Sequence, residues 1–229
     1  MTDREHQRIP YAVEVHYRTA SSFLMAYSVN VSRGGLFLET EQDAAVGSPI
    51  ELRFAVPGAG PITVAGVVAW RRGRENPEGP PGLGLEFHDL TPGLGGVIDH
   101  LVAGYAGMTL LLMSGDRQDR SNLARSMRSI VTTAEIIQAA DARVAETLLN
   151  SEVDLAVIDL DFDEEGGLAT LRAAKAVQPP IPTVALASSK RLRDQARAAG
   201  ADELCSNPPP FSELQLAIVR ALGRPLAVR

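Results

Sequence analysis

The sequence predicts two domains: a six-stranded antiparallel β-barrel with a C-terminal helix, and then an α/β domain with a doubly wound, five-stranded parallel sheet. Two observations lead to this fold class. Between residues 12 and 87, apolar residues recur at every second position, which is typical of strands with one buried face. Beyond residue 108, short continuous apolar runs alternate with helical stretches, as in a parallel sheet covered on both faces. We therefore expect domains at residues 1–106 and 107–229.

The strands of the first domain are expected where the alternation is clearest. Glycine and proline turns separate the clearest segments, which are residues 13–17, 23–31, 50–56, 62–70 and 83–87. In the second of these, Phe23, Met25, Tyr27 and Val29 would face the core, so that Ser28, Asn30 and Ser32 would point outward. In the fourth, Ile62, Val64, Val68 and Trp70 would be buried. About six such strands need a barrel or a sandwich to cover their edges.

A helix should close the first domain. Leu94, Val97, Ile98, Leu101 and Tyr105 follow helical spacing. Thr91 is suited to cap this helix and Pro92 to open it. Glycines at 104 and 107 then mark a short link to the second domain.

The second domain is expected to repeat a strand–helix unit five times. The predicted strands are 109–113, 135–139, 154–159, 182–187 and 203–206. The predicted helices lie around residues 123–130, 144–149, 168–177, 192–199 and 212–222. This alternation predicts a parallel sheet with helices on both faces.

Composition narrows the class of protein. The 229 residues carry a formal net charge of −6, which argues against general nucleic-acid binding but permits a basic patch for a small anion. The apolar runs are too short for a membrane span, and no signal-peptide pattern opens the chain, so a cytoplasmic protein without membrane association is expected. Cys205 is the single cysteine, which excludes an intramolecular disulfide and a cysteine-based zinc cluster and suggests an inert core thiol.

Two short stretches of the first domain carry binding chemistry. Asn30 and Ser32 offer an amide beside a hydroxyl, which suits the edge of a planar base, and Gly34 and Gly35 would let a ligand approach the backbone. Arg4 and Arg8 precede the first strand, where guanidinium groups could pair with phosphate and stack on bases. A plain turn and solvated arginines are the alternative for either stretch taken alone.

Taken together, these stretches indicate a particular family of domains. Arg4-x-x-x-Arg8, Asn30-x-Ser32-x-x-Gly35 and Gly82-x-Gly84-x-x-Phe87 resemble the motifs of a PilZ domain, the bacterial receptor for cyclic di-GMP, over residues 3 to about 103. The resemblance implies that Arg4 and Arg8 grip the phosphates and stack on guanine, that Asn30 and Ser32 bind the other guanine edge, and that Gly35 keeps the turn open. Arg33 is an added candidate for a phosphate contact. Asp3 would oppose a second ligand, which favours one cyclic di-GMP per domain.

The second domain resembles the receiver domain of response regulators from residue 108 to 222. The resemblance places Asp159 at the phosphoacceptor position. The acidic pair that would hold magnesium is replaced by Ser114 and Gly115, the sensing hydroxyl by Ala187, and the expected lysine by Asn207. Asp116 and Ser188 are one residue away from two of these positions. We therefore interpret Asp159 as a degenerate phosphoacceptor or a structural carboxylate.

No metal site or catalytic residue is expected. The acidic run from Asp159 to Glu165 lacks calcium-loop spacing and is expected to be a solvated loop. The four histidines do not pair at ligand or triad spacing. The chain is therefore not expected to be an enzyme or to need a cofactor beyond its ligand.

The main hypothesis is a signalling adaptor. Cyclic di-GMP would order the arginine tail over the barrel, and the pseudo-receiver would pass the new surface to a partner protein. One alternative is a response regulator phosphorylated at Asp159 with a PilZ output domain; another is a scaffold that binds no small molecule. A homodimer through the last helices and acceptance of cyclic GMP-AMP both stay open.

Overall fold

The computed structural model describes residues 11–29, 35–76, 81–87 and 92–228. The chain divides into two units, which are described separately below. Unit 1 comprises residues 1–104 together with 225–229, and unit 2 comprises residues 105–224. The chain therefore leaves unit 1 after its last helix and returns to it at the end.

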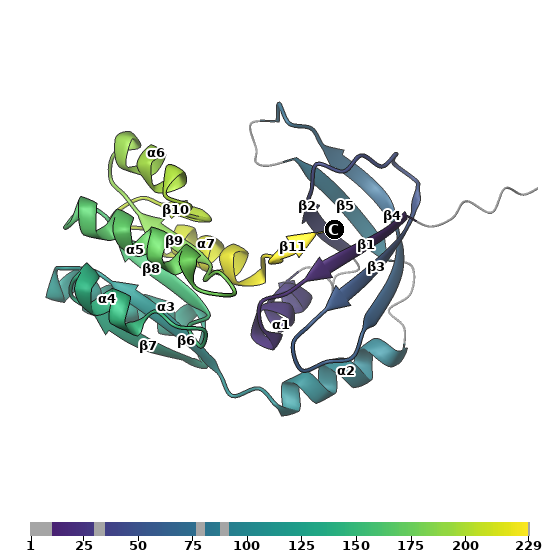
Figure 1. Cartoon of the computed structure of the whole chain (residues 1–229), viewed down its shortest axis with the longest axis horizontal. Coiled ribbons are helices and arrows are strands. Elements are labelled where there is room, and N and C mark those ends of the chain that lie inside the picture. Colours follow the sequence, from purple (N-terminus) through teal and green to yellow (C-terminus); the bar gives the residue numbers. More distant parts are fainter. Residues whose placement is uncertain (1–10, 30–34, 77–80, 88–91, 229) are drawn as a thin grey trace, which may run out of the picture. The chain divides into compact units, whose positions relative to one another are not determined.

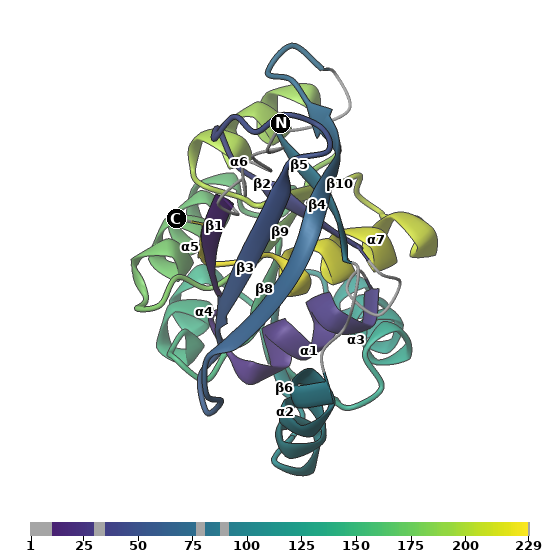
Figure 2. The same ribbon diagram turned by 90° about the vertical axis from the view of Figure 1, so that its right-hand side faces the viewer.

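Unit 1 is built on a curled, mixed sheet, called sheet A (Figure 1). Its strand order is β11-β1-β3-β4-β5-β2, with bounds β1 Tyr11–His16, β2 Gly35–Glu39, β3 Pro49–Ala55, β4 Ile62–Arg72, β5 Gly82–Phe87 and β11 Ala227–Val228. β3 and β4 run side by side and antiparallel (Figure 2). The curled six-stranded sheet agrees with the predicted fold class, with two differences. β1 pairs with β3 in parallel, and the sixth strand comes from the C-terminal end of the chain.

The prediction of a strand at residues 23–31 is wrong for residues 23–29, because Ala20–Val29 forms helix α1. The segment carries both periods: Phe23, Met25, Tyr27 and Val29 alternate, whereas Phe23, Ala26 and Tyr27 have helical spacing. Thr19 favours the helix, since its Oγ1 accepts a hydrogen bond from the Ser22 backbone N–H at 3.0 Å.

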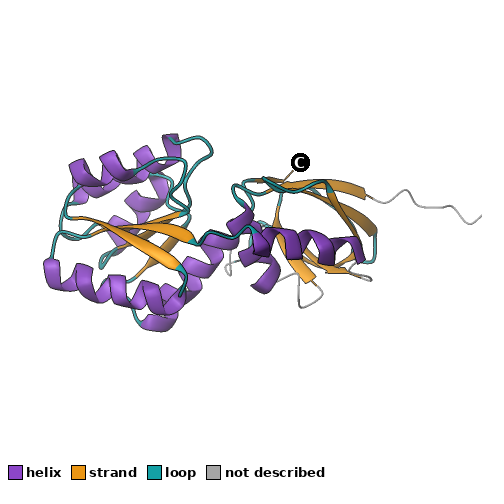
Figure 3. Cartoon of the chain, turned by 90° about the horizontal axis from the view of Figure 1, so that it is seen from below, coloured by secondary structure: helices purple, strands orange, loops and turns teal. Residues whose placement is uncertain are grey.

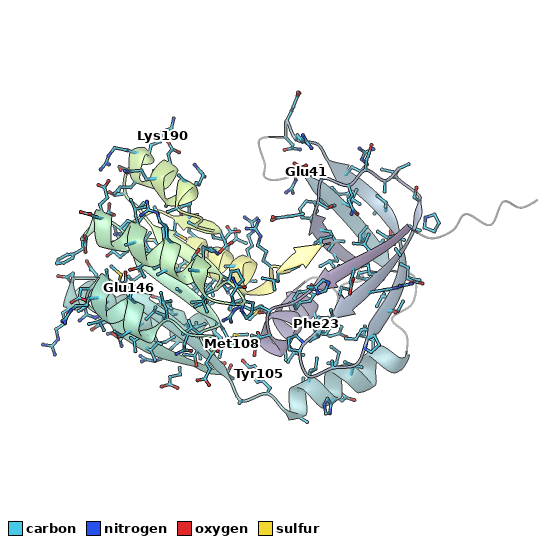
Figure 4. All side chains as sticks on the ribbon, in the orientation of Figure 1. Phe23, Glu41, Tyr105, Met108, Glu146 and Lys190 are labelled. Atoms are coloured by element: carbon cyan, nitrogen blue, oxygen red, sulfur yellow. The ribbon has the colours of Figure 1, made fainter. Side chains whose placement is uncertain are left out.

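The core of unit 1 lies between sheet A and its two helices. Phe23 of α1 is fully buried, packs against Tyr17 and Phe54 at centroid distances of 5.3 and 5.7 Å, and is labelled in Figure 4. Helix α2, Pro92–Ala103, adds Leu94 and Leu101 to the same core. The predicted closing helix is therefore confirmed, beginning at Pro92 as expected.

A β-bulge changes one predicted core position. The register between β4 and β5 shifts between Val68 and Trp70. Val68 is buried as expected, but Trp70 is 45% exposed. Because an extra residue in one strand turns the following side chains to the opposite face, Trp70 lies on the outer face of sheet A.

Unit 2 contains a five-stranded parallel sheet, called sheet B, with the order β10-β9-β8-β6-β7. The strands are β6 Met108–Met113, β7 Ala134–Ala139, β8 Leu155–Asp159, β9 Thr183–Leu186 and β10 Glu203–Cys205. The helices are α3 Arg117–Ile130, α4 Ala142–Leu148, α5 Glu164–Ala176, α6 Lys190–Ala198 and α7 Phe211–Gly223, and they cover both faces of the sheet (Figure 3). β8 is buried along its whole length, as its continuous apolar sequence predicts.

Numbered along the chain, the strands of sheet B have the spatial order 2-1-3-4-5. This is the flavodoxin-like order, in which ligands and reactive groups lie at the carboxyl ends of the strands. The predicted doubly wound α/β unit is therefore confirmed. Within the described part of the chain, no helix is long and apolar enough to span a bilayer.

Candidate functional site

The predicted ligand-binding residues fall mostly outside the described part of unit 1. Arg4, Arg8, Asn30, Ser32 and Arg33 lie in segments that the structure does not describe. The outward alternation inferred for Asn30 and Ser32 was based on a strand at 23–31, and α1 occupies residues 20–29 of that region. Their assignment therefore rests on the motif alone and stays a prediction.

Gly35 is described, and it has a structural role. It opens β2 opposite Glu86 of β5, and its φ is outside the positive region. A Cβ at this position would lie 2.8 Å from the carbonyl oxygen of Leu85. Close strand pairing alone therefore requires glycine here, in addition to any role beside a ligand.

The glycines of the Gly82-x-Gly84 motif lie beneath an aromatic pair. Gly84 is paired with Phe37 of β2 on one side and with Trp70 of β4 on the other. The two rings stack with 5.1 Å between centroids and 9° between planes. A side chain at Gly84 would overlap Trp70, and one at Gly82 would overlap Phe37. The motif therefore makes room for this stack.

Arg72 completes the arrangement on the outer face. Its Cζ lies 4.5 Å from the centroid of Phe37 and 5.6 Å from that of Trp70, within the range of a cation–π interaction. We call Phe37, Trp70 and Arg72 the aromatic–guanidinium stack. The sequence motifs did not reveal it, because its members come from different strands and the bulge in β4 reversed the expected face of Trp70.

In unit 2, Asp159 ends β8 at the carboxyl edge of sheet B and is only 5% exposed. Its Oδ2 accepts a hydrogen bond from Ser114 Oγ at 2.9 Å. Its Oδ1 accepts one from Asn207 Nδ2 at 2.8 Å and one from the Asp161 backbone N–H at 3.0 Å. The two residues predicted at the acidic and lysine positions therefore do reach Asp159, as neutral donors.

Burial dominates the titration of this carboxyl. It raises the pKa of Asp159 above the ordinary value, and the charges of Asp161 and Asp119 act in the same direction. The hydrogen bonds from Ser114 and the Asp161 backbone act in the opposite direction. Burial without a neighbouring cation favours the protonated form of a carboxyl group, whereas a nearby metal ion favours the ionised form.

The acidic positions beside Asp159 are filled by other groups. The ring of Phe162 lies over Gly115, where a side chain on residue 115 would overlap it. Arg120 Nη1 donates to the backbone oxygens of Ser114 and Gly115 at 2.6 and 3.3 Å. Asp116 caps α3 by accepting from the Asp119 backbone N–H at 2.8 Å. Asp116 is therefore engaged as a helix cap, which disfavours it as a replacement metal ligand.

Asp161 joins the same edge to the next loop. It accepts hydrogen bonds from the Ser188 backbone N–H at 3.0 Å and from Ser188 Oγ at 2.7 Å, whereas Ala187 is buried. Asp159 and Asp161 thus connect the loops that follow β6, β8, β9 and β10. These hydrogen bonds join the two carboxyl groups to neutral donors.

The rest of the acidic run stabilises helices. Asp163 caps α5 by accepting from the Gly166 backbone N–H at 3.0 Å, and Glu164 forms two hydrogen bonds of 2.6 Å with Arg191. Those bonds lower the pKa of Glu164. Among the described residues, no group of three or more histidine, cysteine or acidic side chains is placed to hold a metal ion.

The family comparison decides the identity of unit 1. The model of the PilZ domain matches residues 2–104. Residues 2–104 are a PilZ domain. The match includes both predicted binding motifs and every element of unit 1 except β11.

The PilZ domain is followed by a unit with the flavodoxin-like strand order, which receiver domains also have. Solved structures similar to the chain include the receiver domain of a DNA-binding response regulator from Colwellia psychrerythraea, with 20% identity, 51% of this chain and 99% of that chain covered, and a TM-score of 0.46. The receiver domain of a sensor histidine kinase from Pseudomonas aeruginosa gives 21% identity, 52% and 99% coverage, and a TM-score of 0.46. A chemotaxis protein from Vibrio cholerae has 19% identity, with 51% of this chain and 99% of that chain covered, and a TM-score of 0.44. No curated protein matches the chain.

PilZ domains are signalling and binding modules rather than a catalytic family.

Proposed function

We propose that this chain is a cyclic di-GMP-binding signalling adaptor. The observation that carries the proposal is the match of residues 2–104 to the PilZ domain, with Arg4, Arg8, Asn30 and Ser32 at the motif positions. In this proposal, the two arginines pair with the phosphates and stack on guanine, while the amide and the hydroxyl bind a guanine edge. Gly35 and Arg33 complete the predicted site.

Ligand binding is proposed to order the N-terminal arginine tail over sheet A. Ordering a segment converts binding energy into a change of surface, which a partner protein or a second copy of the chain can recognise. Trypsin tests this step directly, because Arg4 and Arg8 are cleavage sites. Cyclic di-GMP should slow cleavage after both arginines while leaving cleavage after the exposed Arg74 unchanged. Equal cleavage rates with and without ligand would contradict the ordering step.

The receiver-like unit is proposed to act without phosphorylation. Phosphoryl transfer to an aspartate needs cations that neutralise the developing charge. Two neutral donors, Ser114 and Asn207, engage Asp159 instead, and Phe162 lies over Gly115. These contacts support a role for Asp159 in holding the loops together rather than in accepting a phosphoryl group.

Isothermal titration calorimetry tests the ligand. We expect low-micromolar or tighter binding of cyclic di-GMP to the full chain, and loss of binding in Arg8→Ala and in Ser32→Ala. Arg53→Ala is the matched control, because Arg53 is exposed on β3 and pairs with Glu51 at 2.8 Å. Unchanged affinity in the two site variants would refute the residue assignment.

Incubation with acetyl phosphate and magnesium, read by intact mass, tests the second half of the proposal. The expected result is no gain of a phosphoryl group in the wild type. The control is Asp159→Asn. A phosphoryl group gained by the wild type and absent from Asp159→Asn would favour a phosphorylated response regulator with a PilZ output.

A further inference from the structure

Sheet A is completed by residues that follow unit 2 in the sequence. β11 pairs with β1 in antiparallel orientation, with Val228 opposite Val15 (Figure 1). The Leu226 backbone N–H donates to the carbonyl oxygen of His16 at 2.7 Å. We call residues 226–228 the strap. Because β3 pairs with one side of β1, the strap covers the opposite edge of that strand.

The strap also adds to the core of unit 1. Val228 packs against the buried cluster that contains Val15 and Phe54, whose side chains are 0% and 2% exposed. A strand at the edge of a sheet opens more readily than a strand with a neighbour on both sides. Loss of the strap would therefore leave the His16 carbonyl without this hydrogen bond and would make β1 the edge of sheet A.

On the other side of Pro225, the chain is fixed to unit 2. Arg224 follows α7 directly and pairs with Asp202 at 3.6 Å. Asp202 is itself held in place, since it pairs with Lys175 and accepts a hydrogen bond from the Thr183 backbone N–H at 2.7 Å. Pro225 is therefore the only residue between a group fixed in unit 2 and a group hydrogen-bonded to β1. One residue spans no more than about 3.6 Å, so this link transmits any larger displacement of α7 to the strap.

The first connection between the units is also short. The Gly104 backbone N–H donates to the carbonyl oxygen of His100 in α2 at 3.1 Å. Tyr105 already belongs to unit 2, where its hydroxyl forms a hydrogen bond of 2.8 Å with Thr133 Oγ1. Gly107 has a φ of 99°, and a Cβ there would lie 2.9 Å from the Thr133 carbonyl oxygen. Both connections, which the structure describes throughout, are therefore short and fixed at each end.

We propose that the strap couples the edge of sheet A to the folded state of α7. While α7 is packed in unit 2, the strap stays on β1. When α7 shifts or opens locally, the strap leaves β1 and the edge of the PilZ sheet opens. β1 leads through Thr19 into α1, whose Phe23 is fully buried, so the change also reaches the core of the PilZ domain. Because coupling between two equilibria is reciprocal, stabilisation of β1 also stabilises α7.

Hydrogen–deuterium exchange of the full chain tests whether the strap protects β1. Leu226→Pro removes the N–H that donates to His16. Amide exchange in peptides that cover β1 should become about tenfold faster, as expected for the loss of a hydrogen bond and its local packing, whereas exchange in β8 should not change. Leu226→Ala is the matched control, because it keeps the N–H and removes a side chain that is 43% exposed. Equal exchange of β1 in the two variants would contradict the proposal.

A second pair of variants tests the coupling itself, and it decides the proposal even if Leu226→Pro does not fold. Leu222→Ala removes a buried side chain from α7 and lies outside unit 1. It should accelerate exchange in β1 as well as in α7. An insertion of about ten glycine and serine residues between Arg224 and Pro225 should abolish the effect on β1, while the effect on α7 remains. Circular dichroism establishes that each variant is folded.

The outcomes of the second pair are distinct. Faster exchange of β1 in Leu222→Ala that disappears with the insertion would support the proposal. Unchanged exchange of β1 in Leu222→Ala, or an equal increase with and without the insertion, would overturn it, since the strap then does not transmit the state of α7. These measurements use no ligand, so their result is independent of whether the chain binds cyclic di-GMP.

Discussion

The Phe37 and Trp70 rings stack directly above Gly84, which lies between them in the three-strand row of β2, β5 and β4. This relationship gives the glycine of the Gly82-x-Gly84 motif a physical reason that the sequence alone does not supply. Because Gly84 has no side chain, the rings of Phe37 and Trp70 can stack above it.

Gly84→Ala should therefore destabilise unit 1. A Cβ would overlap the Trp70 ring, and we expect the free energy of unfolding to fall by about 2 kcal/mol, as for overpacked sites. Urea denaturation followed by Trp70 fluorescence measures this. Gly95→Ala is the control of opposite sign, because Gly95 lies in α2 with open space around its Cβ position, and alanine there should add roughly 1 kcal/mol. Equal effects of the two substitutions would contradict the stacking geometry.

The two lysines of the chain should differ sharply in their contribution to stability. Lys175 of α5 donates to the carbonyl oxygen of Ile181 at 2.9 Å and pairs with Asp202, whereas Lys190 is exposed at the start of α6 (Figure 4). Lys175→Met should cost about 2 kcal/mol, because it removes the hydrogen bond to the buried Ile181 carbonyl oxygen and one of the cations beside Asp202. Lys190→Met should change the free energy of unfolding by no more than about 0.5 kcal/mol. Thermal and urea denaturation of the two variants provide the comparison, and similar losses would show that Asp202 does not depend on Lys175.

Asp159 should make the stability of unit 2 depend on pH in a particular direction. Its pKa is raised in the fold, so the native state holds the proton more tightly than the unfolded chain, whose carboxyl titrates near about 3.9. The stabilisation from protonated Asp159 is complete below that value and is lost as pH rises through the folded pKa. The free energy of unfolding of Asp159→Asn, compared with that of the wild type, should therefore increase over this window and then level off. Urea denaturation across a pH series tests this, and a constant difference between the two proteins would contradict the raised pKa.

Cys205 should resist alkylation in the native protein. The thiol is buried, and burial, together with the charges of Glu213 and Glu203, raises its pKa to about 12. Iodoacetamide at mildly alkaline pH should leave the folded chain unlabelled and label the urea-unfolded chain once. Gln118→Cys places a second thiol at an exposed position and serves as the reactive control. Rapid labelling of Cys205 in folded protein would mean that β10 opens readily.

Unit 2 could be predicted closely from the sequence, because its strands are short and mostly apolar and alternate with stretches of helical period. The resemblance to receiver domains placed Asn207 at the position of the expected lysine, and in the structure Asn207 donates a hydrogen bond to Asp159. Arg120 and Phe162 were missed, since their contacts with Ser114 and Gly115 depend on loop geometry that has no sequence period.

Unit 1 was predicted less completely for identifiable reasons. Residues 20–29 have both the alternation of a strand and the spacing of a helix. The prediction followed the alternation and did not use Thr19, which caps the helix. Trp70 was assigned to the core because a bulge inserts one residue without changing the composition of β4. The pairing of β11 with β1 joins residues more than two hundred positions apart, which no local pattern can indicate.

That pairing also has a consequence for how the protein is made. Leu226 N–H donates to the carbonyl oxygen of His16 at 2.7 Å, and Val228 lies opposite Val15. During translation, β1 emerges from the ribosome long before β11 is synthesised, and the whole of unit 2 is completed in between. One edge of β1 therefore stays unpaired until all other described strands have been synthesised. The nascent PilZ domain thus has an incomplete sheet edge while unit 2 folds.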